Sequence, residues 1–215
     1  MKLSVVIPFY NEENMIQKMY DELVKEINQI TKAEFEIIFI NDGSKDRTFE
    51  RMLAIAAGDS RVKYISFSRN FGKEAGTIAG LEYATGEAVI LMDGDLQHPP
   101  ALLPQMIKAY EEGYDVVSAR RTRTGEKPHR TFLAKHFYRL ANKMMDIELM
   151  DGVSEFRLFS RKAVSAILSL QEYNRFSKGI FAWIGFKEKV IEYENQVRTV
   201  GETKYSLKFS LNYAI

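Results

Sequence analysis

The sequence predicts an α/β fold, a mostly parallel sheet flanked by helices, because two patterns alternate along it. Short apolar runs rich in β-branched residues recur, and each is followed by a segment whose apolar residues repeat at helical spacing. Strands and helices that alternate in this way form parallel sheets with helices on both faces. The predicted strands are 4–7, 35–40, 62–67, 89–92 and 115–119, and the predicted helices are 16–27, 46–57, 71–84 and 100–112.

The composition is that of an ordinary globular protein. The chain has 215 residues, of which 46% are hydrophobic and 27% charged, enough for one large domain with a core. A formal net charge of +1 argues against a general nucleic-acid binder. The sequence has no cysteine, which excludes disulfides, thiolate metal ligands and cysteine nucleophiles. Neither a glycine-rich dinucleotide fingerprint nor a P-loop is present, which argues against those two nucleotide-binding folds.

The second half of the chain has a different character. Between Arg120 and Arg139 there are seven Lys or Arg residues and one acid, Glu126. An amphipathic helix is predicted from Pro128, and its basic face suits an anionic membrane surface, a phosphorylated partner or solvent alone. Further along we predict a short strand within 151–159, helices at 162–168 and 176–184, a strand at 188–197, a polar loop at 198–205 and an apolar helix at 205–215.

Two carboxylates follow the fourth predicted strand. The apolar residues 89–92 lead directly into Asp93 and Asp95, with Gly94 between them, and a proline pair comes shortly afterwards. Two like charges this close together repel each other unless a cation lies beside them. A divalent cation that carries a diphosphate would satisfy both, because Mg²⁺ and Mn²⁺ take hard oxygen ligands. The alternative is an acidic turn that caps the following helix. Gly94 lets the backbone come close to whatever lies there.

Polar residues also follow the first two predicted strands. Tyr10 and Glu12 come after the first strand, and Asp42 comes after the second. The carboxyl ends of parallel strands share one edge of the sheet, where open α/β sheets bind ligands. We therefore expect these residues to meet Asp93 and Asp95 at that edge.

Five stretches occur in this order along the chain: VVIPFYNE (5–12), NDGSKD (41–46), MDGDLQHPP (92–100), FRL (156–158) and VGETKY (200–205). Together they resemble the inverting family 2 glycosyltransferases with a GT-A fold. The QHPP tail and the GETKY loop are similar to the polyprenyl-phosphate glycosyltransferase branch, that of dolichol-phosphate mannose synthase and the bactoprenol glucosyltransferases. The Gln-x-x-Arg-Trp signature of processive polysaccharide synthases is absent from the sequence.

This resemblance implies an enzyme that moves a sugar from a nucleotide-sugar to a polyprenyl phosphate, undecaprenyl or dolichyl, and inverts the anomeric carbon. By family habit the donor would be UDP-glucose or UDP-N-acetylglucosamine. The reaction would take place at the cytoplasmic side of the cell membrane. The implied partners are therefore the donor, the lipid acceptor and the membrane surface, with no nucleic acid. Homo-oligomer formation stays open.

The resemblance also assigns roles on the donor side of the site. Asp95 and Gln97 would hold the Mg²⁺ or Mn²⁺ cofactor, and Asp93 would contact the nucleotide or the sugar. Asp42 would accept a hydrogen bond from the base, although an Asx-turn or capping role is the alternative for this residue. The implied donor-binding residues are Pro8, Tyr10, Glu12, Asp42, Lys73, Asp93 and Gly94.

On the acceptor side, the nucleophile is already an ionised phosphate, so a strong general base is less necessary than cations that bring two phosphates together. Arginine suits this task because its guanidinium donates two hydrogen bonds at once. Candidates on predicted loops are Arg120, Arg198 and Lys204. The acceptor-binding set is Arg120, Arg123, Arg130, Arg198 and Lys204, and the catalytic set is Asp93, Asp95, Glu155 and Arg157.

Two residues of this region are ambiguous in the sequence. The family usually has Asp before the Phe-Arg pair, where this chain has Glu155, whose carboxylate reaches one methylene further. His98 suits either an acid–base role or a rigid turn beside the proline pair, and we assign it no catalysis.

The expected organisation is one GT-A domain in two halves. Residues 1–119 would bind the nucleotide-sugar and residues 120–200 would face the acceptor. Residues 201–215 would begin a juxtamembrane helix that continues into transmembrane segments. Two other functions stay open at this point. One is a metal-dependent nucleotidyltransferase that makes a nucleotide-sugar, and the other is a membrane-recruited binding module without catalysis.

Overall fold

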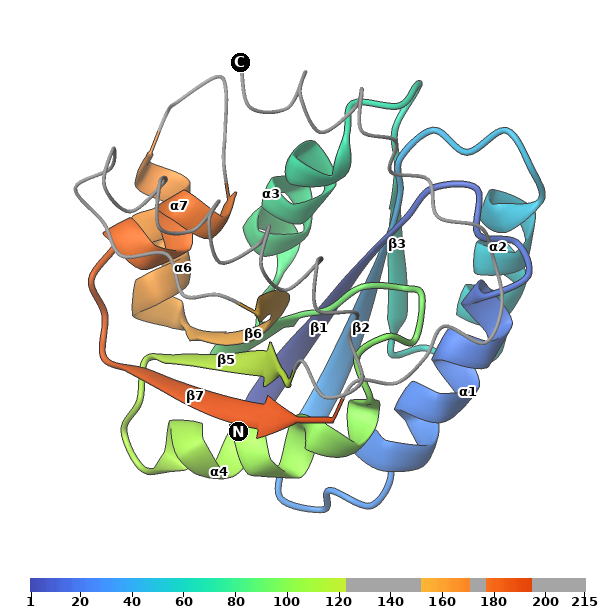
Figure 1. The fold of residues 1–215 in the computed structure, drawn as a ribbon. Helices are drawn as coiled ribbons and strands as arrows, with labels where there is room; N and C mark the ends of the chain where they lie inside the picture. The colour runs from blue at the N-terminus through green and yellow to red at the C-terminus, as the bar shows by residue number, and fades with distance from the viewer. Residues whose placement is uncertain (123–151, 171–176, 195–215) are drawn as a thin grey trace.

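The computed structural model describes residues 1–122, 152–170 and 177–194 (Figure 1). The helix predicted from Pro128, the polar loop at 198–205 and the apolar helix at 205–215 lie outside these residues. None of the described helices is long and apolar enough to cross a lipid bilayer.

One sheet of seven strands organises the fold, in the order β3-β2-β1-β4-β6-β5-β7. The first four strands run parallel to one another and β7 runs parallel to β5, whereas β6 is antiparallel to both β4 and β5. The predicted mostly parallel sheet is confirmed. The strands are β1 (Lys2–Phe9), β2 (Glu34–Asn41), β3 (Val62–Ser66), β4 (Ala88–Leu91), β5 (Val116–Arg121), β6 (Val153–Ser160) and β7 (Glu188–Tyr193).

The second half of the chain completes this sheet. β6 lies between β4 and β5, and β7 forms the edge beyond β5. The boundary expected at residue 119 falls inside β5. The two halves therefore share one continuous sheet, and residues from both meet across the β4–β6 pair.

Helices cover both faces of the sheet (Figure 1). On one face, α1, α2 and α4 pack against Leu3, Val5 and Ile7 of β1, and on the other α3, α6 and α7 join the cluster around Val6. This division follows from the two-residue period of side chains along a strand. The helices are α1 (Ile16–Ile27), α2 (Thr48–Gly58), α3 (Lys73–Tyr83), α4 (Leu103–Glu111), α6 (Arg161–Ser169) and α7 (Ser177–Trp183).

Two helix starts differ from their predicted positions. The helix predicted from residue 100 is a 3₁₀ turn, η1 (Pro100–Leu102), before it becomes α4 at Leu103. The second helix, which we predicted Asp46 to cap, begins at Thr48, and Asp46 lies ahead of it and accepts the backbone N–H and the hydroxyl of Thr48. Both differences are local, because helix ends are the least specified part of a periodic pattern.

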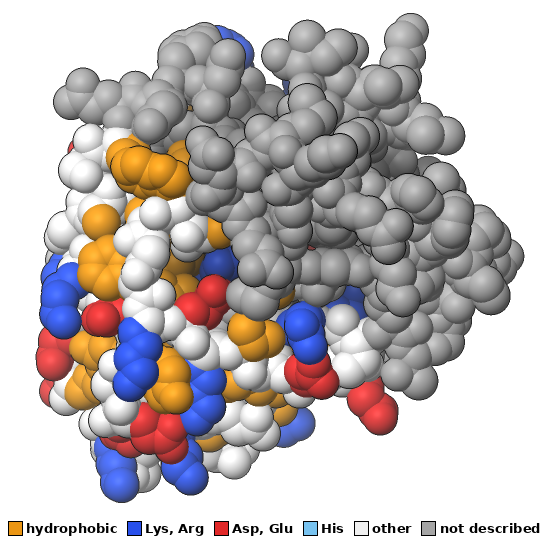
Figure 2. Space-filling view, turned by 60° about the vertical axis from the view of Figure 1, so that its left-hand side comes forward, with side chains coloured by type: hydrophobic (Ala, Val, Ile, Leu, Met, Phe, Trp, Pro, Cys, Tyr) orange, Lys and Arg blue, Asp and Glu red, His pale blue; other side chains and the backbone are white. Residues whose placement is uncertain are grey.

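Charged side chains are mixed on the surface. On the face shown in Figure 2, the described Lys and Arg side chains lie among Asp and Glu side chains, with apolar groups between them. This distribution agrees with the net charge of +1.

Gly80 lets α3 lie close against the sheet. A Cβ built on Gly80 would come within 2.1 Å of Val6 Cγ1, and one on Gly76 would lie 3.5 Å from side-chain atoms of Pro8 and Ile40. Both glycines are buried in α3. The missing side chain at Gly80 therefore sets how closely α3 approaches β1, and with it the position of the helix start at Lys73.

We predict that Gly80→Ala lowers the free energy of unfolding by about 1–3 kcal/mol, although alanine is the better helix former. The added methyl group meets Val6, a β-branched side chain with little rotamer freedom in a buried strand. Denaturant unfolding measures the change. Gly58→Ala is the matched control, because no atom lies within 4 Å of a Cβ at that position in α2. Equal stability of the two variants would contradict the packing argument.

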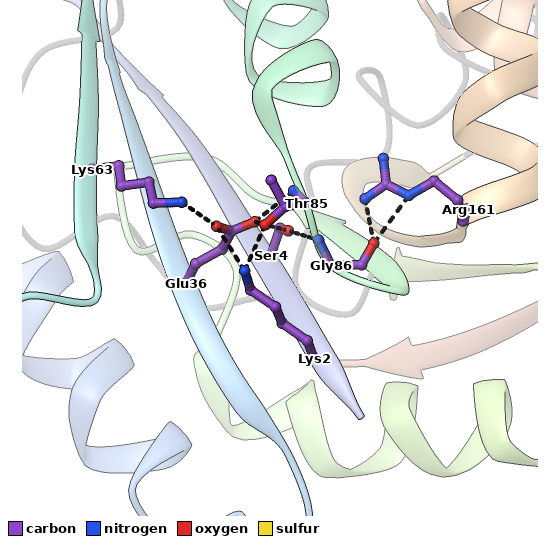
Figure 3. A network of polar contacts seen from close by, with 7 residues as sticks. All are labelled: Lys2, Ser4, Glu36, Lys63, Thr85, Gly86 and Arg161. Carbon is purple, nitrogen blue, oxygen red and sulfur yellow. Dashed lines mark hydrogen bonds and ion pairs between the residues drawn. The ribbon is translucent and has the colours of Figure 1, made fainter.

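A buried carboxylate ties together the amino ends of the strands (Figure 3). Glu36 is 3% exposed and accepts hydrogen bonds from Ser4 Oγ, Lys63 Nζ, and both the backbone N–H and the hydroxyl of Thr85. Lys2 Nζ lies 3.5 Å from the same carboxylate. Burial alone would raise the pKa of Glu36, but these donors outweigh it and lower the pKa to about 2.

The same network extends to the following loop. Ser4 Oγ accepts from the backbone N–H of Gly86, and the guanidinium of Arg161 donates to the carbonyl of Gly86. The network therefore joins β1, β2, β3, the α3–β4 loop and the start of α6 at the edge away from the strands' carboxyl ends.

We predict that Glu36→Gln lowers the free energy of unfolding by about 2 kcal/mol at neutral pH. The folded-state pKa of Glu36 lies below its unfolded value of 4.5. The stabilisation is therefore fully present above pH 4.5 and is lost as the pH falls toward 2. Unfolding curves from pH 7 to pH 3 should show the difference from wild type shrinking. Glu34→Gln, an exposed position on β2, should change little, and a pH-independent difference at Glu36 would contradict the prediction.

Candidate functional site

The carboxyl ends of three neighbouring parallel strands meet at one edge of the sheet. β1 lies between β2 and β4 and runs parallel to both. Tyr10 and Glu12 follow β1, Asp42 follows β2, and Asp93 and Asp95 follow β4. The predicted convergence of the strand ends is confirmed by this pairing.

Hydrogen bonds join the loops after β1 and β2. Ser44 Oγ accepts the backbone N–H of Asn11, and Asn11 Oδ1 accepts that of Lys45. Thr48 Oγ1 accepts the backbone N–H of Glu12. Asn11 has a positive φ of 51°, which is uncommon outside glycine but is tolerated by asparagine. The loop that carries Tyr10 and Glu12 is thus fixed against the loop that carries Asp42.

Asp42 organises the loop before α3. Its Oδ1 accepts the backbone N–H of Phe71 at 2.7 Å, and its Oδ2 accepts from Gly72 N and Asn70 Nδ2. Burial raises the pKa of Asp42, and the two backbone donors oppose that rise. Its neighbour Gly43 is required, because a Cβ there would lie 2.2 Å from the carbonyl carbon of Arg69. All three of these hydrogen bonds join Asp42 to the loop at 70–72. In the described contacts, the Asp42 carboxylate makes no hydrogen bond to its own turn or to the start of α2.

The turn after β4 carries two side chains with oxygens that could bind a metal, those of Asp95 and Gln97. Asp95 Oδ1 accepts the backbone N–H of Gln97 at 3.1 Å, and Leu96 between them has a positive φ of 58°. A bulky residue in that conformation is a strained one, and such strain concentrates at functional sites. Within the described residues, no hydrogen bond is made by Asp95 Oδ2 or by the side chain of Gln97.

The side-chain oxygens of Asp95 and Gln97 suit the predicted Mg²⁺ or Mn²⁺. A carboxylate and an amide oxygen are hard ligands of the kind that Mg²⁺ and Mn²⁺ prefer. Across residues 1–122, 152–170 and 177–194, no cluster of three or more His, Cys, Asp or Glu residues is placed to bind a metal. A site of two protein ligands completed by phosphate and water is therefore the arrangement that the described side chains allow.

Gly94 has a packing role in the structure. A Cβ at this position would lie 2.3 Å from the ring of Phe9. The space left by the missing side chain is therefore filled by an aromatic residue of β1, and the predicted contact of Gly94 with the donor stays a prediction. This close approach fixes the Asp93–Asp95 turn against the end of β1.

Asp93 lies in a cluster of charged and aromatic side chains. Lys73 Nζ, at the start of α3, is 2.5 Å from Asp93 Oδ1 and 2.8 Å from Glu155 Oε2 of β6. His98 Nε2 lies 3.4 Å from Asp93 Oδ2. Burial opposes the charge of Asp93, but the Lys73 ammonium and the contact with His98 outweigh it and hold the pKa of Asp93 well below its ordinary value.

His98 connects this cluster to the edge strand β7. Its Nδ1 lies 2.5 Å from the hydroxyl of Tyr193, and both residues are buried. The neutral tautomer with its proton on Nε2 satisfies both contacts, because Nδ1 then accepts from the tyrosine hydroxyl. Burial raises the pKa of Tyr193, so the hydroxyl keeps its proton to donate.

The sequence analysis missed Tyr193 and gave His98 no partner. His98 follows Asp93 by only five residues, and that proximity was a usable signal. The residues around Tyr193 give no indication that it lies in the site. The parallel pairing of β5 with β7 brings it next to His98.

Two predicted cations lie in strands. The prediction that Arg120 lies on a loop is wrong, because Arg120 belongs to β5 and pairs with Glu192 across the β5–β7 register. Arg157 is 5% exposed in β6, where its Nε donates to the carbonyl of Ser154 and its guanidinium lies 5.2 Å from the Phe181 ring centroid. Burial lowers the pKa of Arg157 from its ordinary value. Arg123, Arg130, Arg198 and Lys204 lie outside the described residues.

We predict that Tyr193→Phe lowers the free energy of unfolding by about 1–2 kcal/mol, because it leaves His98 Nδ1 buried without its partner. Thermal unfolding followed by circular dichroism measures the loss. The control is Tyr83→Phe, since Tyr83 is 65% exposed. An unchanged melting temperature for Tyr193→Phe would show that the contact contributes nothing.

Solved structures share this fold. A mannosyltransferase from Pyrobaculum calidifontis, in complex with GDP-Man and Mn²⁺, superimposes with a TM-score of 0.62 at 18% identity, over 88% of this chain and 54% of that one. Glucosyl-3-phosphoglycerate synthase from Mycobacterium tuberculosis, in complex with Mn²⁺, UDP-glucose and phosphoglyceric acid, gives a TM-score of 0.61 at 20% identity, over 99% and 76%. The seven-stranded, mostly parallel sheet flanked by helices is thus the GT-A glycosyltransferase fold.

Sequence comparison gives the family. The family model for glycosyl transferase family 2 matches residues 4–168, and the chain belongs to that family. A putative glycosyltransferase, CsbB, of Bacillus subtilis is 51% identical over 99% of this chain and 64% of its own length. The bactoprenol glucosyl transferase of Shigella phage SfX is 42% identical over 96% of this chain and 68% of its own. The chain spans about two thirds of the length of these relatives.

Proposed function

We propose that this domain transfers a sugar from a nucleotide-sugar to a polyprenyl phosphate and inverts the anomeric carbon. The observation that carries the proposal is the strained turn after β4, where Asp95 Oδ2 and the Gln97 side chain make no hydrogen bond to any described residue and lie beside the anchored carboxylate of Asp93. The lipid acceptor is supported by relatives named bactoprenol glucosyl transferase at 42% identity. Family membership also favours sugar transfer over the nucleotidyltransferase alternative.

On the donor side, the joined loops after β1 and β2 form the nucleoside pocket in this proposal. Pro8, Tyr10 and Glu12 supply one wall of it, and Asp42 fixes the opposite loop at 70–72 through three hydrogen bonds. Each carboxylate oxygen has two lone pairs, so Asp42 Oδ1 has one left for the N–H of a base. The relatives' names favour a glucosyl donor, and we propose UDP-glucose, with UDP-N-acetylglucosamine as the second choice.

Asp95 and Gln97 are the residues that would hold Mg²⁺ or Mn²⁺. When bound, such a cation neutralises the negative charge that grows on the departing nucleoside diphosphate. Solved structures of the same fold are described with Mn²⁺, which supports a divalent cation without separating the two metals. Asp93 is then the donor-side carboxylate, with its position set by Lys73 and His98.

On the acceptor side, Glu155 and Arg157 of β6 lie next to the donor-side turn. Leu91 of β4 pairs with Arg157, so the two strands bring both halves of the chain together at this point. The lipid phosphate is itself the nucleophile, and the remaining task is to bind and orient an anion. We assign that task to Arg123, Arg130, Arg198 and Lys204, with the basic run at 120–139 meeting an anionic membrane on its cytoplasmic side.

We predict that Asp95→Ala reduces sugar transfer by at least about 10²-fold, because it removes a ligand of the charge-stabilising cation. Transfer from radiolabelled UDP-glucose to undecaprenyl phosphate in detergent micelles, with and without Mn²⁺, measures the loss. A chelator should abolish transfer by the wild-type chain, and circular dichroism should show that the variant is folded.

The control is Asp21→Ala, which removes an exposed carboxylate of α1 and should keep full activity. Calorimetry of the chain with UDP, GDP and their sugars, with and without Mn²⁺, tests the donor class directly. Undiminished transfer by Asp95→Ala in the presence of a chelator would reject the metal site. Liposome binding without any nucleotide affinity would reject the enzyme and favour a binding module.

A further inference from the structure

Three segments of the chain meet at the ammonium of Lys73. Lys73 is the first residue of α3, Asp93 follows β4, and Glu155 belongs to β6. The antiparallel register that pairs Leu91 with Arg157 brings the two carboxylates to the same place, whatever side chain stands at position 73. Like charges brought together by a sheet register repel each other, and Lys73 lies between them at 2.5 Å and 2.8 Å.

The contacts of Asp93, Lys73 and Glu155 show which of their polar atoms are already bonded. Asp93 uses Oδ1 for Lys73 and Oδ2 for His98, so both of its oxygens are engaged. Lys73 has three protons and uses two of them. Glu155 uses Oε2 alone in the described contacts. The side chain of Lys73 is 34% exposed, whereas that of Glu155 is 16% exposed.

The charge of Lys73 also supports a bridge between Asp93 and Glu155. Burial alone would lower the pKa of Lys73, but the charges of Asp93 and Glu155 outweigh it and raise that pKa above its ordinary value. The lysine therefore keeps its positive charge near neutral pH.

We infer that Lys73 is a positioning residue that ties the donor-side carboxylate Asp93 to the acceptor-side carboxylate Glu155, so that an anionic phosphate acceptor approaches a pair whose negative charge is halved by the ammonium. This inference rests on the proposed function and adds a residue that acts on the acceptor step. Without the ammonium, the acceptor phosphate would face two uncompensated carboxylates, and like charges juxtaposed at a binding surface oppose association.

The length of Glu155 is part of the arrangement. Shortening this side chain by one methylene withdraws its carboxylate by about one bond length, ~1.5 Å. From the present 2.8 Å, that movement takes the oxygen out of hydrogen-bond range of Lys73. Glu155→Asp therefore breaks the bridge while it keeps the charge.

The first test separates donor binding from the acceptor step. For Lys73→Met, the Kd of UDP in the presence of Mn²⁺ should change by less than about threefold, while kcat/KM for polyprenyl phosphate should fall by about 10²-fold. Glu155→Asp should show the same split. Lys73→Arg keeps the charge and should recover activity to within about tenfold of wild type. Lys18→Met, on the exposed side of α1, is the matched control and should behave as wild type.

A second test needs no activity. In a double-mutant cycle of denaturant unfolding with Lys73→Met and Glu155→Gln, the two changes should be coupled by about fivefold or more in the unfolding equilibrium constant. Additive changes would overturn the bridge. An equal loss of donor affinity and acceptor kcat/KM in Lys73→Met would also overturn the inference, because Lys73 would then contact the donor. If the wild-type chain transfers no sugar, the proposed function fails, and the unfolding cycle still decides whether the bridge exists.

Discussion

The crowding of carboxylates at the carboxyl edge of the sheet is the constraint on which the site depends. Asp93, Asp95 and Glu155 are brought there by strands β4 and β6, whose register is set by apolar side chains in the core. The fold therefore imposes a local negative charge that it must compensate. Lys73 offsets one of the two negative charges of Asp93 and Glu155. Asp95 has no cation beside it among the described contacts, and this is the basis for placing a divalent metal there.

The opposite edge of the sheet shows the same chemistry with a different outcome. Glu36 is also a buried carboxylate at a strand, but lysine, serine and threonine donors satisfy it from four directions (Figure 3). A fully hydrogen-bonded buried carboxylate stabilises the fold and has nothing left for a ligand. Glu36 is therefore a structural carboxylate and Asp95 a candidate functional one. The hydrogen-bond donors around each side chain distinguish them, rather than burial alone.

The sequence predicted those features that depend on local pattern. The strand predicted at 35–40 is β2 at Glu34–Asn41, because a run of buried apolar and β-branched residues specifies a strand without reference to its neighbours. Asp93 and Asp95 were readable because they follow an apolar run directly.

Features that depend on long-range pairing were not predictable in the same way. No local pattern places β6 between β4 and β5, and that placement alone brings Glu155 to Lys73. Arg120 looked like a loop residue because polar residues follow it, yet β5 continues to Arg121 through its pairing with β7. The packing of Phe9 against Gly94 also depends on the pairing of β1 with β4 and could not be predicted from the residues around Gly94.

Rigidity at the candidate site comes from the same long-range contacts. Asn11 and Leu96, both with positive φ, lie in the loops after β1 and β4, and hydrogen bonds or close packing hold each loop in place. Strained backbone persists only where the surroundings over-determine it. The turn of Asp95 and Gln97 is held by Phe9 against Gly94 on one side and by the anchored Asp93 on the other. Oxygen ligands fixed in this way lose little conformational entropy when a cation binds. The site is therefore preorganised, because folding has already ordered these side chains.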